Sequence, residues 1–93
     1  MWVDEVLKKY NRRKMLITFS PHLFDREAER HLNLDYVEAA ARTGRVIYEK
    51  CEPPRKLCFE RYFGKENRTY TVIAWFHEDF VEVRTCWIEK GRR

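Results

Sequence analysis

Glycine is scarce in this sequence of 93 residues, which contains three glycines in all. No glycine-rich phosphate-binding loop occurs, and the GxSxG, HExxH and EF-hand patterns are absent as well. Such motifs place a phosphate, a nucleophile or a metal at a fixed point of a fold. Their absence excludes the NTPase, α/β-hydrolase and common metalloenzyme classes, and we expect no cofactor.

Long apolar runs are also missing. No segment approaches the roughly 20 apolar residues that a membrane-spanning helix needs, and the N-terminus lacks the apolar region of a signal peptide. We therefore expect a cytoplasmic protein with no membrane partner.

Cysteine is limited to Cys51, Cys58 and Cys86, an odd number without a CxxC pair. This pattern favours reduced thiols over a disulfide framework. A zinc site that combines the three thiols with His77 is an alternative, but its spacing matches no standard ligand pattern. We predict no metal site, with Cys58 and Cys86 acting as small apolar residues of strands.

The residues that are present suit one soluble domain over residues 1–93, because domains typically run to about 100–150 residues. Hydrophobic residues make up 44% of the chain, charged residues 37%, and the formal net charge is +4. The basic residues gather near both ends, in Lys8, Lys9, Arg12, Arg13 and Lys14 and again in Lys90, Arg92 and Arg93. These patches predict contact with a polyanion; the alternative is a solvated surface with a disordered basic tail over residues 89–93.

Three helices are predicted in the first half of the chain. Residues 1–12 form an extra N-terminal helix whose apolar stripe, with Val3, Val6 and Leu7, we expect to dock on the domain itself. A second helix begins after the capping residue Ser20 and ends near residue 31. A third helix covers residues 35–43.

The third helix has its own boundary signals. Asp35 and Glu38 form a capping-box pattern, and Asn33 just before them is expected to be a left-handed turn residue. Gly44 follows the helix at the position where glycine is common.

Five strands are predicted, over residues 15–19, 45–49, 57–63, 69–76 and 81–87. The continuous apolar run 15–19 is typical of a buried strand. Residues 69–76 are apolar on both faces, which indicates the central strand with Trp75 in the core. In the last strand, Val81, Val83, Thr85 and Trp87 are expected to face the core. The order predicts an α+β domain, with helices on one face of a three- to five-stranded antiparallel sheet.

A stripe of His22, Arg26 and Arg30 lies at helical spacing on the second helix. The two arginines are like charges one turn apart, which is unfavourable unless an anion or a carboxylate sits between them. The stripe is therefore a candidate anion-binding site.

The segment ITF-SPHLFDREAERHLNLDYVEAA-RVI resembles a branch of small RelE-like and BrnT-like proteins that carry an H-x3-R-x3-R helix after a first strand. His22, Arg26 and Arg30 fill these three positions. The stretches GKENRTYTVIAWF and VEVRTCWIE are similar to the last two core strands of that branch, so the resemblance covers about residues 17–88. It implies a RelE-like fold and a toxin-type ribonuclease, or an RNA-binding relative, that acts without a metal.

The resemblance implies that the partner is RNA, free or on a ribosome, and that an antitoxin protein covers the basic surface or pairs with the N-terminal helix. A homodimer through the apolar stripe of that helix is the competing outcome. In this interpretation His22 is the catalytic base or acid, and Arg26 and Arg84 hold the phosphate. Tyr62 or Tyr70 stacks on a base. The remaining nucleic-acid contacts are expected from Arg30, Arg61, Lys8, Lys9, Arg12, Arg13 and Lys14.

Structural roles are the alternative for several of these residues. His22 and Arg26 are then a helix stripe beside the core, paired with Asp25, Glu29 or Glu49, and Arg84 forms a cross-strand ion pair with Glu60. Arg61 either extends its stem along an apolar face or answers a buried acid. His77 is expected to be exposed and idle. The competing function is a non-enzymatic protein-interaction module.

Overall fold

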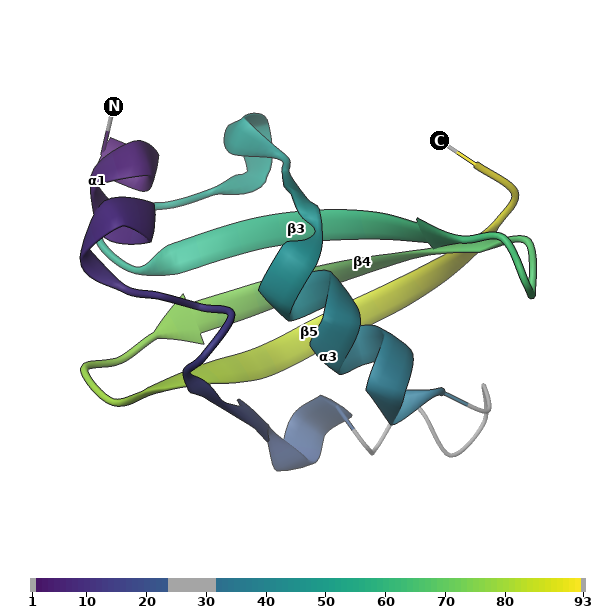
Figure 1. The fold of residues 1–93 in the computed structure, drawn as a ribbon, viewed down its shortest axis with the longest axis horizontal. Helices are drawn as coiled ribbons and strands as arrows, with labels where there is room; N and C mark the ends of the chain where they lie inside the picture. Colours follow the sequence, from purple (N-terminus) through teal and green to yellow (C-terminus); the bar gives the residue numbers. More distant parts are fainter. Residues whose placement is uncertain (1, 24–31, 93) are drawn as a thin grey trace.

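The structure is a computed structural model that describes residues 2–23 and 32–92, and its fold is an α+β arrangement (Figure 1). Helices α1 (Trp2–Lys9) and α3 (Leu34–Thr43) pack on a five-stranded sheet whose strand order is β1-β5-β4-β3-β2. The strands are β1 (Leu16–Phe19), β2 (Arg45–Val46), β3 (Lys56–Phe63), β4 (Arg68–Phe76) and β5 (Phe80–Lys90). A short 3-10 helix, η1 (Tyr48–Lys50), follows β2. Residues 21–23 are helical, and the rest of the predicted second helix lies outside the described residues.

The central position of β4 is confirmed. Its neighbours are β3 and β5, both antiparallel to it, and Figure 1 shows α3 lying across these three strands. The helix-facing side chains Tyr70, Val72, Ala74 and Phe76 are buried. Trp75 points to the opposite face, where no described helix covers it, and it is only half-buried. The prediction that Trp75 lies in the core is therefore wrong.

The sheet is mixed, not antiparallel throughout as predicted. β1 pairs with β5 in parallel, with Ile17 beside Val81, and it lies at the edge of the sheet. Alternation then places Ile17 in the core and leaves Leu16 65% exposed. The prediction of a fully buried first strand over residues 15–19 is wrong because the strand, Leu16–Phe19, lies at the edge of the sheet with one covered face.

A β-bulge at Arg84 changes which side chains of β5 point toward the core. Thr85 lies opposite Ile73 and Val83 lies opposite Ala74, so Arg84 is the extra residue that has no partner on β4. Val81 and Val83 face the core as predicted, but beyond the bulge Cys86 takes the core side. The prediction that Thr85 and Trp87 face the core is wrong, because the extra residue reverses the alternation.

The start of α3 also differs from the prediction. Asn33 is the N-cap, with an extended backbone (φ −89°), and its Oδ1 accepts hydrogen bonds from the backbone N–H groups of Asp35 and Tyr36. Asn33 therefore forms no left-handed turn. Because Asn33 is the N-cap, Asp35 lies within the first turn of α3 and not at the N-cap position that an Asp35–Glu38 capping box requires. Glu38 instead pairs with Arg42 at 2.9 Å. The predicted strand 45–49 is reduced to two residues because η1 follows directly.

Two arginines join the N-terminal segment to the C-terminal end of α3. The guanidinium of Arg12 donates to the carbonyls of Ala41 (3.0 Å) and Gly44 (2.9 Å) and lies 4.1 Å from the centre of the Phe59 ring. In return, Nη1 of Arg42 donates to the carbonyls of residues 12, 13 and 15. We call this reciprocal arrangement the arginine clasp. It holds α1 in place, and the docking of α1 on its own domain is confirmed by the burial of Val3.

Gly44 lies where the end of α3 comes close to the backbone of β3. A Cβ atom built on Gly44 would lie 2.5 Å from the carbonyl oxygen of Ala40 and 2.8 Å from that of Glu60. Its φ of −66° suits any residue, so the requirement is space and not conformation.

We predict that Gly44→Ala lowers the free energy of unfolding by about 1–3 kcal/mol, because both obstructing atoms belong to the backbone. The matched control is Gly64→Ala, whose Cβ would meet only the Tyr62 ring at 3.6 Å. Urea unfolding followed by circular dichroism measures both variants. Equal stability of the two would contradict the close approach of α3 and β3.

Candidate functional site

The face of the sheet opposite α3 carries three aromatic rings, each with a cation over it. Cζ of Arg92 lies 4.4 Å from the centre of the Tyr62 ring, and Cζ of Arg84 lies 4.3 Å from the centre of the Trp75 ring. Nζ of Lys50 lies 4.9 Å from the centre of the Trp87 ring. The registers place the three rings together on this side, because Tyr62 pairs with Thr69, Trp87 pairs with Thr71, and residues 69, 71 and 75 alternate along β4. We call this surface, which α3 does not cover and which η1 borders through Lys50, the helix-free face.

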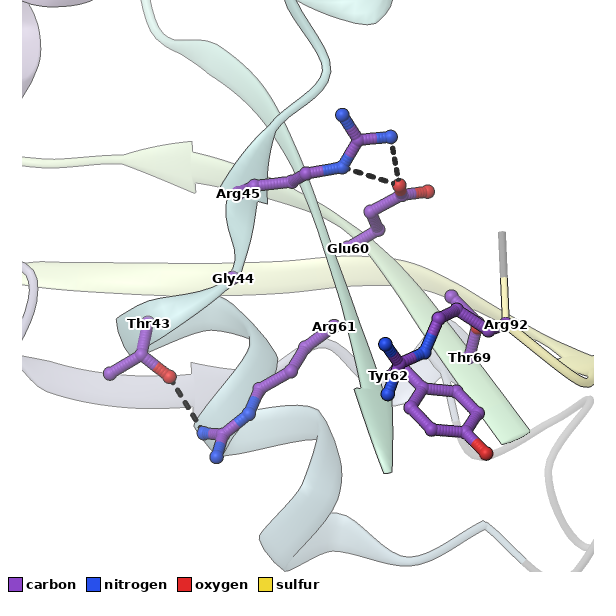
Figure 2. Close-up of a pocket in the computed structure, with 8 residues that line it drawn as sticks. All are labelled: Thr43, Gly44, Arg45, Glu60, Arg61, Tyr62, Thr69 and Arg92. Carbon is purple, nitrogen blue, oxygen red and sulfur yellow. Dashed lines mark hydrogen bonds and ion pairs between the residues drawn. The ribbon is translucent and has the colours of Figure 1, made fainter. Parts of the chain in front are cut away.

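A hollow of about 290 Å³ opens at the border of the helix-free face, beside the end of α3 (Figure 2). It contains three arginines and one acid, namely Arg45, Arg61, Arg92 and Glu60, together with Tyr62. Figure 2 shows Arg92 lying over the Tyr62 ring and Arg61 reaching back to Thr43, whose Oγ1 accepts its hydrogen bond at 2.7 Å. The hollow therefore has an excess of positive charge.

A second hollow of about 270 Å³ adjoins the first and shares Arg45 and Glu60 with it. It reaches across the sheet to Thr71 and Trp87 and is bordered by Lys50. Between the hollows, Nε of Arg45 donates to Oε1 of Glu60 at 2.7 Å, and Glu60 is only 9% exposed. This pair replaces the predicted Arg84–Glu60 ion pair, because Glu60 lies opposite Arg45 in the β2–β3 register.

Arg84 belongs to a cluster at the other end of the helix-free face. Its Nε donates to Oε1 of Glu82 at 2.9 Å, and Nε2 of His77 lies 3.4 Å from the same oxygen. Burial alone would raise the pKa of the Glu82 carboxyl, but hydrogen bonds and charge from Arg84 and His77 outweigh it and lower that pKa. His77 also stacks on Phe80 at 4.4 Å. The expectation that His77 is exposed and idle is therefore wrong.

The predicted catalytic stripe can be placed only at its first residue. His22 is exposed, and its backbone N–H donates to Oγ of the capping residue Ser20 at 3.3 Å. Arg26 and Arg30 lie outside the described residues. No hydrogen bond or ion pair joins His22 to Arg84, both of which the structure describes, so their joint action in catalysis stays a prediction.

The N-terminal basic residues divide into one structural arginine and four exposed cations. Lys8, Lys9, Arg13 and Lys14 are exposed, and Lys8 and Arg13 border a hollow of about 360 Å³ beside α1. Arg12 is held in the arginine clasp, and its burial, with the charge of Arg13, lowers its pKa. Each of its terminal nitrogens donates to a carbonyl and the side chain is only partly exposed, so Arg12 is held against the fold and is not presented to solvent as its four neighbours are.

The structure distinguishes the two tyrosines that were predicted to stack on a base and shows the role of Arg61. Tyr62 lies on the helix-free face with its hydroxyl bonded to Asn67 at 2.8 Å, whereas Tyr70 is 1% exposed beneath α3 and cannot stack on a base. Arg61 extends along the Phe63 ring to Thr43, so its head is exposed and answers no buried acid.

The three cysteines do not gather into a metal site. Cys86 faces the core beside Val72, whereas Cys58 pairs with Ile73 on the opposite side of the sheet. Burial raises the pKa of the Cys58 thiol to about 11, which disfavours the thiolate that a metal binds. Within residues 2–23 and 32–92, no group of three or more His, Cys, Asp or Glu side chains is arranged to hold a metal ion.

Comparison of the chain with protein-family models, with curated proteins and with solved structures found no match. The RelE-like resemblance consequently stays an expectation drawn from the residues. In the described part of the chain, the helices are too short or too polar to cross a membrane.

Lys50, Trp75 and Trp87 were not predicted as site residues, and Arg92 was predicted only as part of a basic tail. The signal for Trp87 was obscured by the bulge at Arg84, which cannot be read from the alternation of β5. Lys50 reaches the ring through η1, a turn that the pattern 45–49 did not indicate.

We predict that Arg12→Ala destabilises the fold by about 1–3 kcal/mol, because two carbonyls at the end of α3 lose a charged donor. Arg13→Ala removes an equal charge from an exposed neighbour and should change stability by less than about 0.5 kcal/mol. Chemical unfolding compares the two variants. Similar losses for both would show that the clasp contributes nothing specific.

Proposed function

We propose that this protein is a RelE-like RNA-binding protein that holds single-stranded RNA across the helix-free face. The main support is the group of three half-buried rings, Tyr62, Trp75 and Trp87, each with a cation over it. Unpaired bases stack on aromatic rings and on guanidinium planes, while basic side chains neutralise the phosphates between them. An array of rings on an open sheet offers both kinds of contact along one strand.

The cations beside the three rings favour RNA binding over the protein-interaction module. A surface that docks an apolar partner presents uncovered apolar groups at its centre. On the helix-free face each ring has a cation beside it, Arg84, Arg92 or Lys50, so the surface is charged and not apolar, and a base can stack on a guanidinium plane or replace a cation on its ring. The apolar stripe of α1 packs against the protein's own core. A protein-interaction module is therefore the alternative function, and the RNA-binding experiments below test it.

The resemblance extends the proposal to a toxin-type ribonuclease that acts without a metal. Arg84 supports this extension, since its guanidinium lies on the helix-free face beside Trp75, where it can hold a phosphate of a bound strand. An antitoxin that carries acidic residues would then compete with RNA for this face, and a homodimer would have to leave it open.

We predict that Trp87→Leu weakens the binding of a short single-stranded RNA about tenfold, because base stacking on an aromatic ring contributes roughly 1–3 kcal/mol per base. The matched control is Tyr48→Leu, which removes an exposed ring that contacts Asp4 of α1 and lies outside the helix-free face. Fluorescence anisotropy measures the affinity, and circular dichroism confirms that both variants are folded. Equal affinities for the two variants would contradict the proposed face.

We predict further that Lys50→Gln reduces the slope of log affinity against log salt by about 0.7, the value for one phosphate contact on a single strand. Arg13→Gln should leave the slope unchanged, because Arg13 is not among the cations of the helix-free face. A slope reduced by Arg13→Gln and unchanged by Lys50→Gln would instead indicate that RNA binds at the N-terminal basic residues. The absence of RNA binding at low salt would favour the interaction module.

A further inference from the structure

We propose that the hollow shown in Figure 2 binds the phosphate monoester at the end of a nucleic-acid strand. The inference rests on the proposed function in one respect, since it takes the bound strand to lie on the helix-free face. It adds a preference for a phosphorylated end, which the aromatic rings alone do not provide.

The charge balance of the hollow favours a doubly charged group. Three guanidinium groups, of Arg45, Arg61 and Arg92, line it against the single carboxylate of Glu60, which gives an excess of two positive charges. Glu60 is engaged by Arg45. Among the described residues, Arg61 and Arg92 form no ion pair; Arg61 contacts a hydroxyl and Arg92 a ring. A phosphate monoester carries about −1.5 to −2 charges near neutral pH, whereas a diester within a strand carries only one.

The donors that face the hollow come from arginines and not from hydroxyl groups. Oγ1 of Thr43 donates to the carbonyl of Ala39, and Oγ1 of Thr69 donates to the carbonyl of Gly91, so both hydroxyl protons are in use. Guanidinium groups bind the oxygens of a phosphate through paired N–H donors. Arg61 and Arg92 therefore supply the contacts that distinguish a monoester from a hydroxyl end.

The backbone conformation of Gly91 determines where Arg92 lies. Gly91 adopts φ +87°, its N–H donates to the carbonyl of Asn67 at 2.7 Å, and its carbonyl accepts from Thr69. Asn67 also holds the hydroxyl of Tyr62. The hydrogen bond from Gly91 to Asn67 thus joins the backbone beside Arg92 to the β3–β4 turn that holds the Tyr62 ring.

The size and place of the hollow suit a strand end. Its volume of about 290 Å³ is at the lower limit of the roughly 300–1,000 Å³ typical of ligand pockets, which limits it to about one nucleotide. The end of α3, at Thr43 and Gly44, borders it. The neighbouring hollow lies on the side of Trp87, shares Arg45 and Glu60 with it, and is also lined by Glu49. A strand on the helix-free face would therefore end here.

The test compares one short RNA in three forms, with a 5′-phosphate, with a 3′-phosphate and with hydroxyl groups at both ends. We expect one phosphorylated form to bind wild-type protein about tenfold more tightly than the hydroxyl form, as for paired charge-assisted hydrogen bonds. The form that gains affinity identifies which end enters the hollow. In the double variant Arg61→Gln/Arg92→Gln the preference should fall below about twofold. Arg55→Gln, which removes an exposed arginine at the opposite end of β3, should retain the preference.

A second measurement separates the hollow from the rest of the face. Nuclear magnetic resonance titrations with adenosine 5′-monophosphate, adenosine 3′-monophosphate and adenosine should show shifts at Arg61, Tyr62 and Arg92 for one nucleotide and none for the nucleoside. RNA binding without any end preference would overturn the inference and leave the proposed function intact. Nucleotide shifts at the hollow without RNA binding would support the hollow and contradict the proposed function. Phosphate binding in the hollow would be contradicted if the nucleotides caused no shifts there and the three RNA forms bound equally.

Discussion

The β-bulge at Arg84 is the constraint on which the character of the helix-free face depends. By adding one residue to β5 opposite the step from Ile73 to Ala74, it keeps Val81 and Val83 in the core and then turns Cys86 inward. Trp87 consequently faces away from α3, and the guanidinium of Arg84 lies over Trp75. A regular strand would have placed Trp87 beneath the helices, where a ring cannot meet a ligand.

The arginines of this chain serve two distinct purposes, which charge alone does not reveal. Arg12 and Arg42 donate to backbone carbonyls across the gap between the N-terminal segment and α3, so their donors stabilise the fold. Arg61, Arg84 and Arg92 rest on aromatic rings at the surface and keep donors available. A guanidinium can perform either role because it combines a planar face with several N–H donors. The site therefore follows from where each arginine is held and not from the number of basic residues.

The sequence was informative wherever a pattern has one physical cause. The two-sided apolar character of residues 69–76 correctly predicted the central strand, and the stripe of α1 correctly predicted docking on its own domain. The parallel pairing of β1 and the bulge at Arg84 depend on contacts between distant residues, so local patterns could not show them. The N-cap at Asn33 is made by local hydrogen bonds, but Asn33 and Asp35 both suit an N-cap and the sequence favoured Asp35. Of the candidate site, Tyr62, Arg61 and Arg84 were named from the sequence. Trp87 and Lys50 were missed because the bulge and η1 determine where they point.

The three tryptophans allow the central claim, binding of single-stranded RNA on the helix-free face, to be tested in one measurement. Trp75 and Trp87 lie on that face, whereas Trp2 belongs to α1 and packs against the core from the helix side. Titration of ¹⁵N-labelled protein with a short single-stranded RNA reports on each indole N–H separately. RNA bound on the helix-free face should cause progressive shifts of the Trp75 and Trp87 signals while the Trp2 signal stays in place. A shift confined to Trp2, or no shift of any indole at RNA concentrations that saturate binding, would contradict binding on this face.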